Sequence, residues 1–159
     1  MEFNSEISFR KCLNNEYDMK LIFEWSNDEE VRKNSFSSKK IEFEDHKKWF
    51  QSKINAENYH ILFFMVNYKE VGLVRLEVED YKAIISYQIS KDYRGLGYGK
   101  TMIHLLEKYV LENKLATCLY GEVKKGNVSS QRIFESLDYR KFLEEDKCIY
   151  KKTIERRTK

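Results

Sequence analysis

The spacing of apolar side chains in the first third of the chain predicts one strand followed by three short helices. The pattern at residues 7–12 is that of a first strand. Asn15 is placed to cap the first helix, and Asn27-Asp28 to open a second that runs to residue 34. A polar segment, residues 35–40, separates it from the third. Apolar positions at intervals of three and four mark the inner faces of the first and third helices: Leu21, Ile22, Trp25, His46, Trp49, Phe50 and Ile54.

From residue 61 the pattern changes to an apolar run of strand length, followed by an alternating segment at residues 71–78, and both indicate strands. Runs at residues 61–66, 71–78 and 83–89 are joined by polar turns at 67–70 and 79–81, an arrangement that predicts an antiparallel meander. The remaining elements alternate in type: a helix carrying Met102, Leu105, Leu106 and Tyr109, a strand at 119–123, a helix at 128–137, and a hairpin at 139–142 and 148–153. Antiparallel strands followed by alternating strands and helices predict an α+β domain.

Composition narrows the class of protein. The chain has 159 residues, of which 35% are charged and 42% hydrophobic, so one folded domain over residues 1–159 is expected. No Pro and no Gly/Ser-rich linker marks a domain boundary. Lys and Arg outnumber Asp and Glu only by 29 to 26, which argues against a nucleic-acid partner. Basic residues gather at the C-terminal end, where we expect solvated charges: Lys151, Lys152, Arg156, Arg157 and Lys159.

Cysteine usage and the absence of targeting signals predict a cytoplasmic protein. Cys12, Cys118 and Cys148 are far apart and form no C-x-x-C pair. Residues 1–4 lack the basic and then apolar run of a signal peptide, and no apolar stretch is long enough to cross a membrane. The histidines show no spacing typical of metal ligands, so no metal site is expected; they are His46, His60 and His104.

Three of the six glycines fall within five residues, in the segment Tyr93-Arg94-Gly95-Leu96-Gly97-Tyr98-Gly99-Lys100. This glycine turn follows a predicted strand and opens a predicted helix. Glycines let the backbone take positive φ values and approach a ligand closely, and free N–H groups at a helix start bind anions. The turn therefore predicts a phosphate or pyrophosphate site. A tight turn without a ligand is the alternative, but it rarely needs three glycines.

The spacing of the glycines excludes two common phosphate loops. A P-loop requires a glycine where Arg94 stands, although Gly99-Lys100-Thr101 would fit its end. The dinucleotide fingerprint G-x-G-x-x-G fails because Lys100 or Met102 occupies its third glycine position. The segment does fit Q/R-x-x-G-x-G/A, starting at Arg94.

This pattern resembles that of the GCN5-related N-acetyltransferase (GNAT) family, whose corresponding loop holds the pyrophosphate of acetyl-CoA. Residues 127–134 also match N-x-x-S/A-x-x-x-Y/F, and Leu137-Asp138-Tyr139 matches L-G-F/Y. The order of elements agrees with the family from residue 61 to residue 153. The resemblance implies one α+β domain in which about four to five helices flank a mostly antiparallel sheet, splayed at the acetyl-CoA site.

The resemblance also implies which residues meet acetyl-CoA, the co-substrate, within a core at about residues 59–153. The strand before the glycine turn would pair its backbone with the pantetheine arm, and the Ile89 N–H would stabilise the oxyanion. Asn127 would hydrogen-bond the arm or a water while also capping its helix. The expected cofactor-binding residues are Gln88, Ile89, Ser90, Arg94, Gly95, Leu96, Gly97, Tyr98, Gly99, Lys100, Asn127, Ser130 and Phe134.

Two positions depart from the family pattern. The tyrosine that often protonates the departing thiolate is Phe134 here, and a phenyl ring cannot donate a proton. A phenol restored at this position should leave activity equal or higher if water supplies the proton. The glycine before the closing aromatic is Asp138, which tolerates left-handed backbone better than most residues and is expected to replace it structurally.

Acetyl transfer to an amine needs a base, a donor to the carbonyl oxygen and a means of accommodating the thiolate. Glu77 and Glu122 are the candidate bases, each on a strand that flanks the predicted splay; a solvated carboxylate or an ion pair is the alternative for either. Tyr87 and Tyr139 are the available phenols, with packing as the alternative role and solvent as the alternative acid. The expected catalytic residues are Glu77, Glu122 and Tyr87.

The N-terminal part, about residues 1–58, would shape the acceptor site. Its segment W-x-N-D-x-x-x-R-x-x-S-F, followed by H-x-x-W-F, resembles the GNAT branch that acetylates amino sugars on nucleotide carriers, as in pseudaminic-acid-type pathways. In such a site an aromatic ring stacks on a base or sugar and an arginine meets the pyrophosphate, whereas core packing and surface charge are the alternatives. The expected acceptor-binding residues are Trp25, Asn27, Arg32, Phe36 and Arg75.

The sequence thus predicts an acetyl-CoA-dependent N-acetyltransferase, a monomer or homodimer with no nucleic-acid or membrane partner. Its acceptor would be a small-molecule amine, foremost a nucleotide-linked amino sugar. Two alternatives stay open. A ribosomal-protein N-terminal acetyltransferase shares a similar N-D-x-x-x-R opening, and the absence of a phenol at Phe134 keeps open a non-catalytic module that only binds acyl-CoA.

Overall fold

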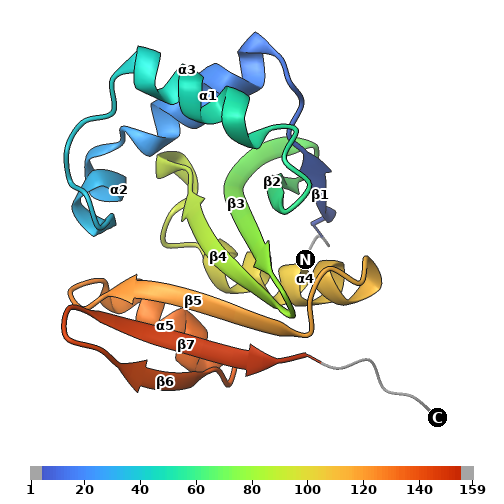
Figure 1. Cartoon of the computed structure of the whole chain (residues 1–159), viewed down its shortest axis with the longest axis vertical. Coiled ribbons are helices and arrows are strands. Elements are labelled where there is room, and N and C mark those ends of the chain that lie inside the picture. The colour runs from blue at the N-terminus through green and yellow to red at the C-terminus, as the bar shows by residue number, and fades with distance from the viewer. Residues whose placement is uncertain (1–4, 155–159) are drawn as a thin grey trace.

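A computed structural model of the chain describes residues 5–154, and one seven-stranded sheet forms its centre (Figure 1). The strand order is β1-β2-β3-β4-β5-β7-β6, and all neighbours run antiparallel except β4 and β5. The strands are β1 (Ile7–Lys11), β2 (Tyr59–Val66), β3 (Lys69–Glu79), β4 (Lys82–Ile89), β5 (Cys118–Lys124), β6 (Arg140–Leu143) and β7 (Lys147–Thr153). The helices are α1 (Glu16–Ser26), α2 (Glu29–Asn34), α3 (Phe43–Lys53), α4 (Tyr98–Glu112) and α5 (Val128–Ser136), with a 3₁₀ turn η1 (Lys91–Tyr93). The predicted α+β class is confirmed.

The meander turns are tighter than the polar segments suggested. Asn67 and Tyr68 both take positive φ, 49° and 69°, so two residues reverse the chain, and the next two already pair with β2. The predicted turn over 67–70 was therefore too long by two residues. Asp80 likewise takes a φ of 53°, and the predicted turn over 79–81 loses its first residue to β3.

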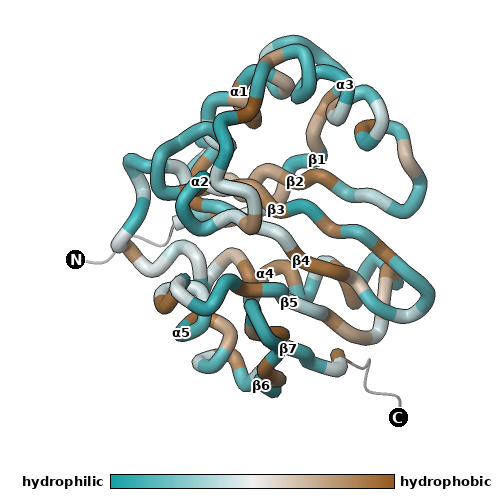
Figure 2. Tube along the Cα trace, turned by 60° about the vertical axis from the view of Figure 1, so that its left-hand side comes forward, coloured by the Kyte–Doolittle hydropathy of each residue, from teal (hydrophilic) through white to brown (hydrophobic). Residues whose placement is uncertain are grey.

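Two hydrophobic clusters lie on opposite faces of the sheet, because side chains alternate along each strand. Helices α4 and α5 pack on one face, against residues such as Leu76 and Ile85, and α1 and α3 pack on the other, against Phe63 and Leu73. Figure 2 shows the hydrophobic stretches along the central strands, with hydrophilic loops around them. The sheet is thus covered on both sides at β2 and β3.

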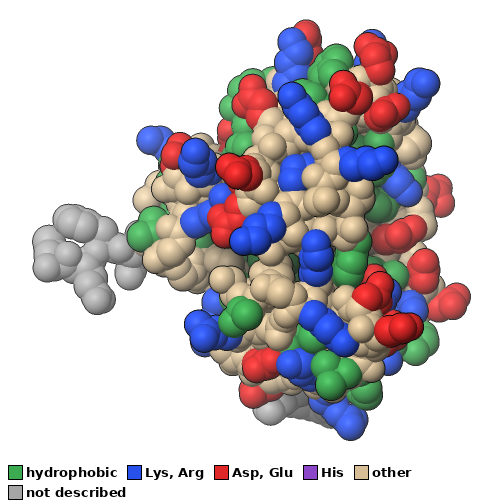
Figure 3. Space-filling view, turned by 90° about the vertical axis from the view of Figure 1, so that its left-hand side faces the viewer, with side chains coloured by type: hydrophobic (Ala, Val, Ile, Leu, Met, Phe, Trp, Pro, Cys, Tyr) green, Lys and Arg blue, Asp and Glu red, His purple; other side chains and the backbone are tan. Residues whose placement is uncertain are grey.

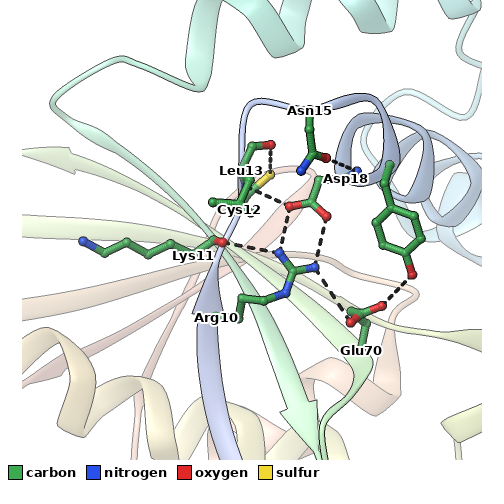
Figure 4. Close-up of polar contacts among 8 residues, drawn as sticks. Arg10, Lys11, Cys12, Leu13, Asn15, Asp18 and Glu70 are labelled. Atoms are coloured by element: carbon green, nitrogen blue, oxygen red, sulfur yellow. Dashed lines mark hydrogen bonds and ion pairs between the residues drawn. The ribbon is translucent and has the colours of Figure 1, made fainter.

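A polar network ties the first strand to the first helix (Figure 4). Arg10 donates two hydrogen bonds to the buried Asp18 carboxylate, at 2.8 and 3.0 Å, and the Leu13 N–H donates a third at 2.8 Å. Asn15 caps α1, as predicted, by accepting from the Asp18 N–H at 2.8 Å. Glu70 on β3 lies 3.8 Å from Arg10, so the same network reaches the third strand. Buried carboxylates need such pairing.

The sheet opens between its two parallel strands. β4 and β5 pair only from Lys82–Cys118 to Ile85–Gly121, and beyond that point they separate, as Figure 1 shows. The last four residues of β4 still pair with β3 but leave their other edge free. The splay that the family resemblance implied is therefore present, and it faces α2 and the glycine turn.

The C-terminal basic residues are not all solvated. Lys152 donates to both Glu107 carboxylate oxygens, at 3.0 and 3.2 Å, and to the Leu137 carbonyl at 2.9 Å. Lys151 lies over the rings of Tyr120 and Phe142. Lys151 and Lys152 belong to β7 and are partly buried, so their charges are satisfied by partners within the fold. Arg156, Arg157 and Lys159 lie outside the described residues. No helix in residues 5–154 is long and apolar enough to span a membrane.

Candidate active site

A cavity of about 1020 Å³ occupies the opening between β4 and β5. Four segments line it: the separated ends of the two strands, the glycine turn with the start of α4, the first turns of α5, and α2 with the loop that follows. Figure 3 looks toward this side of the molecule and shows basic side chains across its middle, with acidic ones among them. The net charge of the cavity wall therefore depends on which of these side chains form ion pairs with one another.

The glycine turn closes one end of the cavity with backbone N–H groups. Gly97 has a φ of 84° and is the N-cap of α4, a helix without a side-chain cap and without acidic residues in its first turn. Its first intrahelical bond runs from Thr101 N to Gly97 O, so the three preceding N–H groups have no partner within the helix. A Cβ on Gly99 would overlap Ile133 of α5, whereas one on Gly97 would meet open space. The turn therefore forms an anion cradle.

Arg94, expected to bind acetyl-CoA, is already occupied. Its guanidinium contacts the carboxylates of Asp28 and Glu30 on α2, both at 2.9 Å, and its Nε donates to the Ile89 carbonyl at 3.0 Å. Although burial opposes it, the hydrogen bonds from Arg94 and from the Val31 N–H lower the pKa of Asp28. Arg94 lines the cavity, but its charge is neutralised by these two carboxylates. The ion pairs join the glycine turn to α2.

The free edge of β4 presents backbone groups to the cavity. The Ser90 N–H donates to Val71 O on β3 at 2.8 Å. Since successive N–H groups of a strand point to opposite edges, those of Ile89 and Tyr87 point into the opening. Gln88 is buried and donates to Ser26 Oγ on α1 at 3.4 Å. Ser90 and Leu96, both expected to bind cofactor, do not line the cavity, whereas Gln88 and Ile89 do.

Helix α5 brings two polar side chains to the cavity wall. Asn127 caps the helix by accepting from the Ser130 N–H at 3.3 Å. The Ser130 hydroxyl and the Tyr87 hydroxyl lie 2.7 Å apart in a hydrogen bond between α5 and β4. Burial raises the pKa of Tyr87 to about 12. All three side chains line the cavity, but Tyr139 does not, since it packs edge-on behind Phe134.

Phe134 sits where the two strands begin to separate. Its ring stacks on Tyr150 with centroids 5.3 Å apart, and a Cβ on Gly121 would overlap its tip. Gly121 belongs to the last residue pair joining β5 to β4. The tip of the ring therefore lies against Gly121, and the effect of a phenol at this position stays a prediction. Asp138 takes a φ of 68°, as predicted.

The two candidate bases differ in position. Glu122 lines the cavity on the separated part of β5, and its carboxylate lies 3.2 Å from Lys147 Nζ. The hydrogen bond and charge of Glu122 raise the pKa of Lys147, which stays protonated. Glu77 does not line the cavity, because it pairs with Ile84 in the part of β4 that is still joined to β5.

Most of the N-terminal motif holds the fold rather than the cavity. Trp25 packs edge-on against Phe63 in the cluster beneath α1 and α3. The Asn27 side chain both donates to and accepts from the Ile41 backbone, at 2.9 and 2.7 Å, and so fastens the loop before α3. Neither residue lines the cavity. Phe36 does, with 55% of its surface exposed.

Arg32 organises the loop that forms one cavity wall. It donates to the carbonyls of Ser26, Ser37 and Lys39, at 2.7, 3.2 and 3.1 Å, and to the Ser35 hydroxyl at 3.2 Å. Of its five N–H groups only one is left for a ligand. These partners carry no charge, so the positive charge is not neutralised. Burial and the charge of Arg75 lower the pKa of Arg32.

Arg75 and Lys124 add uncompensated charge to the same wall. Arg75 projects from β3 with its guanidinium 5.5 Å from the Trp49 ring centre. Lys124, which the sequence reading missed, donates to the carbonyls of Lys33 and Ser35. Strand alternation after Glu122 was the signal that could have found it. Arg32, Arg75 and Lys124 take part in none of the ion pairs within residues 5–154.

The histidines lie apart from this chemistry. His46 is buried, and its Nε2 lies 2.8 Å from the Met19 carbonyl, which it binds as a donor. It joins α3 to α1. Burial and the charge of Arg75 lower the pKa of His46, even though the hydrogen bond to Met19 opposes this. The part of the chain that the structure describes holds no group of three or more His, Cys, Asp or Glu side chains arranged for a metal ion.

The family is settled by a match over most of the chain. The family described as "Acetyltransferase (GNAT) domain" matches residues 9–140. The chain belongs to the GNAT acetyltransferases. It is therefore an N-acetyltransferase with acetyl-CoA as its co-substrate, and the non-catalytic alternative is not supported. No curated protein matches the chain.

Solved structures share the GNAT fold at low identity. Spermidine N-acetyltransferase from Vibrio cholerae, solved with CoA and spermine, is 15% identical over 91% of this chain and 92% of its own, with a TM-score of 0.77. A ribosomal L7/L12 alpha-N-protein acetyltransferase with CoA is 12% identical over 93% and 94%, with a TM-score of 0.78. The aminoglycoside acetyltransferase AAC(6')-Ib with CoA is 14% identical over 93% and 95%, with a TM-score of 0.77. At these identities the likeness shows the fold and leaves the acceptor open.

The residues of this GNAT domain fit acetyl-CoA. The glycine turn offers unpaired N–H groups for its pyrophosphate, and the free edge of β4 offers N–H groups for its amide-containing arm. Lys100 and Arg132, which also line the cavity near the turn, add positive charge for its phosphates. Arg132 was not among the predicted site residues, although it stands within the Asn127 motif.

Proposed function

We propose that the acceptor amine belongs to a small molecule that also carries an anionic group, in the class of nucleotide-linked amino sugars. The balance of charge on the acceptor side carries this proposal. Arg32, Arg75 and Lys124 line the cavity without a carboxylate partner in residues 5–154, whereas the two lining glutamates, Glu30 and Glu122, are each paired with a cation. Partly buried cations without a partner favour a ligand that brings negative charge.

Arg75 is the cation best prepared for this role. It is half-buried, it takes part in no ion pair in the described part of the chain, and the Trp49 ring lies against one side of its guanidinium. Its planar fork suits a phosphate or carboxylate. Phe36, exposed at the cavity wall, offers a ring face for a sugar or base. A polyamine is disfavoured, because the carboxylates that line the cavity are already paired and the unpaired cations would repel it.

The chain's own groups divide the reaction between them. When bound, acetyl-CoA supplies an activated thioester. Glu122, on the same face of β5 as Lys124, takes the proton from the acceptor amine, and Lys147 Nζ lies 3.2 Å from its carboxylate. The N–H of Ile89, directed into the opening, donates to the carbonyl oxygen as it gains charge. Positioning by the glycine turn and β4 supplies a large part of the rate.

The test is a comparison of acceptors with free-thiol release as the readout. The panel holds a nucleotide-linked amino sugar, an amino-sugar phosphate, the neutral amino sugar, spermidine and a peptide with a free N-terminus. We expect the highest kcat/KM for an anionic amino sugar. Arg75→Gln should raise the KM of that acceptor about tenfold, the worth of a charge-assisted hydrogen bond, with little change in kcat.

Arg140→Gln is the matched control. Arg140 lies exposed on β6 and does not line the cavity, so its loss should leave KM near wild type. A higher kcat/KM for spermidine or for the neutral sugar would contradict the proposal. So would equal effects of the two arginine variants.

A further inference from the structure

One hydrogen-bonded pair on the cavity wall takes no part in the reaction steps described under the proposed function. The Tyr87 hydroxyl and Ser130 Oγ are 2.7 Å apart, and both side chains line the cavity. Tyr87 comes from the separated part of β4, two residues beyond the last pair with β5. Ser130 comes from the first turn of α5 and is buried. The pair thus joins β4 to α5 near the narrow end of the opening.

The departing thiolate needs a proton, and none of the groups described above supplies one. As the amine nitrogen bonds to the acetyl carbon, the carbon–sulfur bond breaks and a thiolate departs. Phe134 has no proton to give, and the tip of its ring packs against Gly121. Its ring centre lies 6.1 Å from that of Tyr87, so the nearest phenol on the cavity wall stands beside the position where the family pattern has one.

We propose that the Tyr87 hydroxyl, hydrogen-bonded to Ser130, is the proton donor to the departing thiolate. The Tyr87 O–H bond breaks as the sulfur takes the proton, and the Ser130 hydroxyl then donates its hydrogen bond to the phenolate oxygen. Solvent returns a proton to Tyr87 after the thiol leaves, while Glu122 releases to solvent the proton taken from the amine. The overall transfer is balanced: one proton leaves the amine and one joins the sulfur.

The surroundings of Tyr87 keep its hydroxyl protonated and place a second hydroxyl, that of Ser130, beside it. Burial raises the pKa of Tyr87 to about 12, and the hydrogen bond to Ser130 opposes part of this rise. The phenol is therefore protonated at neutral pH before transfer, and Ser130 stabilises the phenolate after it. Tyr139 provides the contrast: it is also buried next to Phe134, but it does not line the cavity.

The proposal rests on acetyl transfer in this cavity and on no particular acceptor, so binding can test it without one. Isothermal titration of CoA and of desulfo-CoA, which lacks the thiol, measures contact with the sulfur directly. The titrations are made at pH 9, where part of a thiol with an ordinary pKa of about 8.5 is ionised. We expect Tyr87→Phe to weaken CoA binding about tenfold, because a hydrogen bond to a charged group is lost. Desulfo-CoA binding should stay unchanged.

Matched variants complete the experiment. Tyr139→Phe should change neither affinity, and Ser130→Ala should weaken CoA binding less than Tyr87→Phe does. With an active acceptor, Tyr87→Phe should lower kcat while the acceptor KM stays near wild type. Equal weakening of CoA and desulfo-CoA would show that Tyr87 only shapes the wall, and unchanged binding of both would show that it does not reach the sulfur; either result overturns the proposal. A wild type that binds neither ligand would instead remove the cavity as the CoA site.

Discussion

At the scale of single residues, the arginines of the cavity differ in what their guanidinium groups already bind. Arg94 is neutralised by two carboxylates, Arg32 is bound to uncharged carbonyls and a hydroxyl, and Arg75 lies against an aromatic ring. Of the three, only Arg75 has neither a carboxylate partner nor a set of carbonyl groups bound to its guanidinium. The carboxylates divide in the same way, since Glu122 reaches the cavity and Glu77 does not.

This difference between the two glutamates leads to a prediction about the base. Glu122→Gln keeps the shape but removes the proton acceptor, so kcat should fall roughly 100-fold. Glu77→Gln, a matched change on the same face of the sheet, should leave kcat near wild type. The measurement is steady-state acetyl transfer near neutral pH, where the acceptor amine is mostly protonated.

A control variant and the pH dependence of kcat test this prediction further. Glu122→Gln also breaks the pair with Lys147, so Lys147→Gln serves as a control; it leaves the carboxylate in place and should not reduce kcat as strongly. The defect of Glu122→Gln should shrink at higher pH as free amine increases. Full activity in Glu122→Gln, or equal losses in both glutamate variants, would contradict the assignment.

At the scale of elements, the glycine turn connects three parts of the site. It joins β4 to α4, its N–H groups form the anion cradle, and Arg94 fastens it to α2 on the acceptor side. The positive φ of Gly97 starts α4 without a side-chain cap, and this leaves the helix N-terminus open to an anion. Ligand binding therefore depends on backbone conformation at one turn.

Gly97→Asn tests the cradle at its most sensitive point. Asn tolerates the left-handed backbone that Gly97 adopts, but its side chain would project into the space where the pyrophosphate should lie. We expect the rise in melting temperature with acetyl-CoA to be largely lost, consistent with an affinity at least about tenfold lower. Gly126→Asn is the control: Gly126 also has open space around it but lies outside the cavity lining. An undiminished shift in Gly97→Asn would remove the turn from the binding site.

At the scale of the whole molecule, one sheet joins two hydrophobic clusters and opens between β4 and β5. β4 and β5 pair over only four residue pairs, whereas β3 pairs with β4 over eight. His46 is buried against the N-terminal cluster beneath α1 and α3, where it packs on Trp49 and Phe50, and its pKa lies below its usual value. A histidine held neutral in this way makes the stability of the fold depend on pH.

The direction of this dependence follows from proton linkage. The unfolded chain binds a proton at His46 near pH 6.5, and the folded chain does so only at lower pH, so stability falls as the pH drops below about 6.5. Urea unfolding at pH 7.5 and pH 5.5 should show a smaller loss for His46→Gln than for wild type. His60, whose pKa burial also lowers, keeps part of the slope. His104→Gln, at an exposed site, should retain the wild-type loss; the same loss in His46→Gln would contradict the argument.

Local patterns were enough for the elements and for the glycine turn that lines the cavity. Periodicity located the five helices and seven strands to within a few residues, because burial on one face imposes a period of two or 3.6 on the sequence. The glycine spacing and the Asn127 motif indicated the acetyl-CoA loop, since a chain reversal with positive φ and a helix cap are local requirements. Asp138 was interpreted correctly for the same reason.

The acceptor end required the tertiary structure, because there the role of a side chain depends on partners far away in the chain. Arg94 meets Asp28 and Glu30 across more than sixty residues, and Asn27 fastens Ile41, so the motif that suggested a nucleotide-sugar contact is largely a folding motif. Phe134 against Gly121, and Tyr87 against Ser130, likewise join residues from separate elements. The sequence alone determined that the chain contains arginines, tyrosines and glutamates near the predicted site. Which of them are free to act was decided by burial and pairing in the folded sheet.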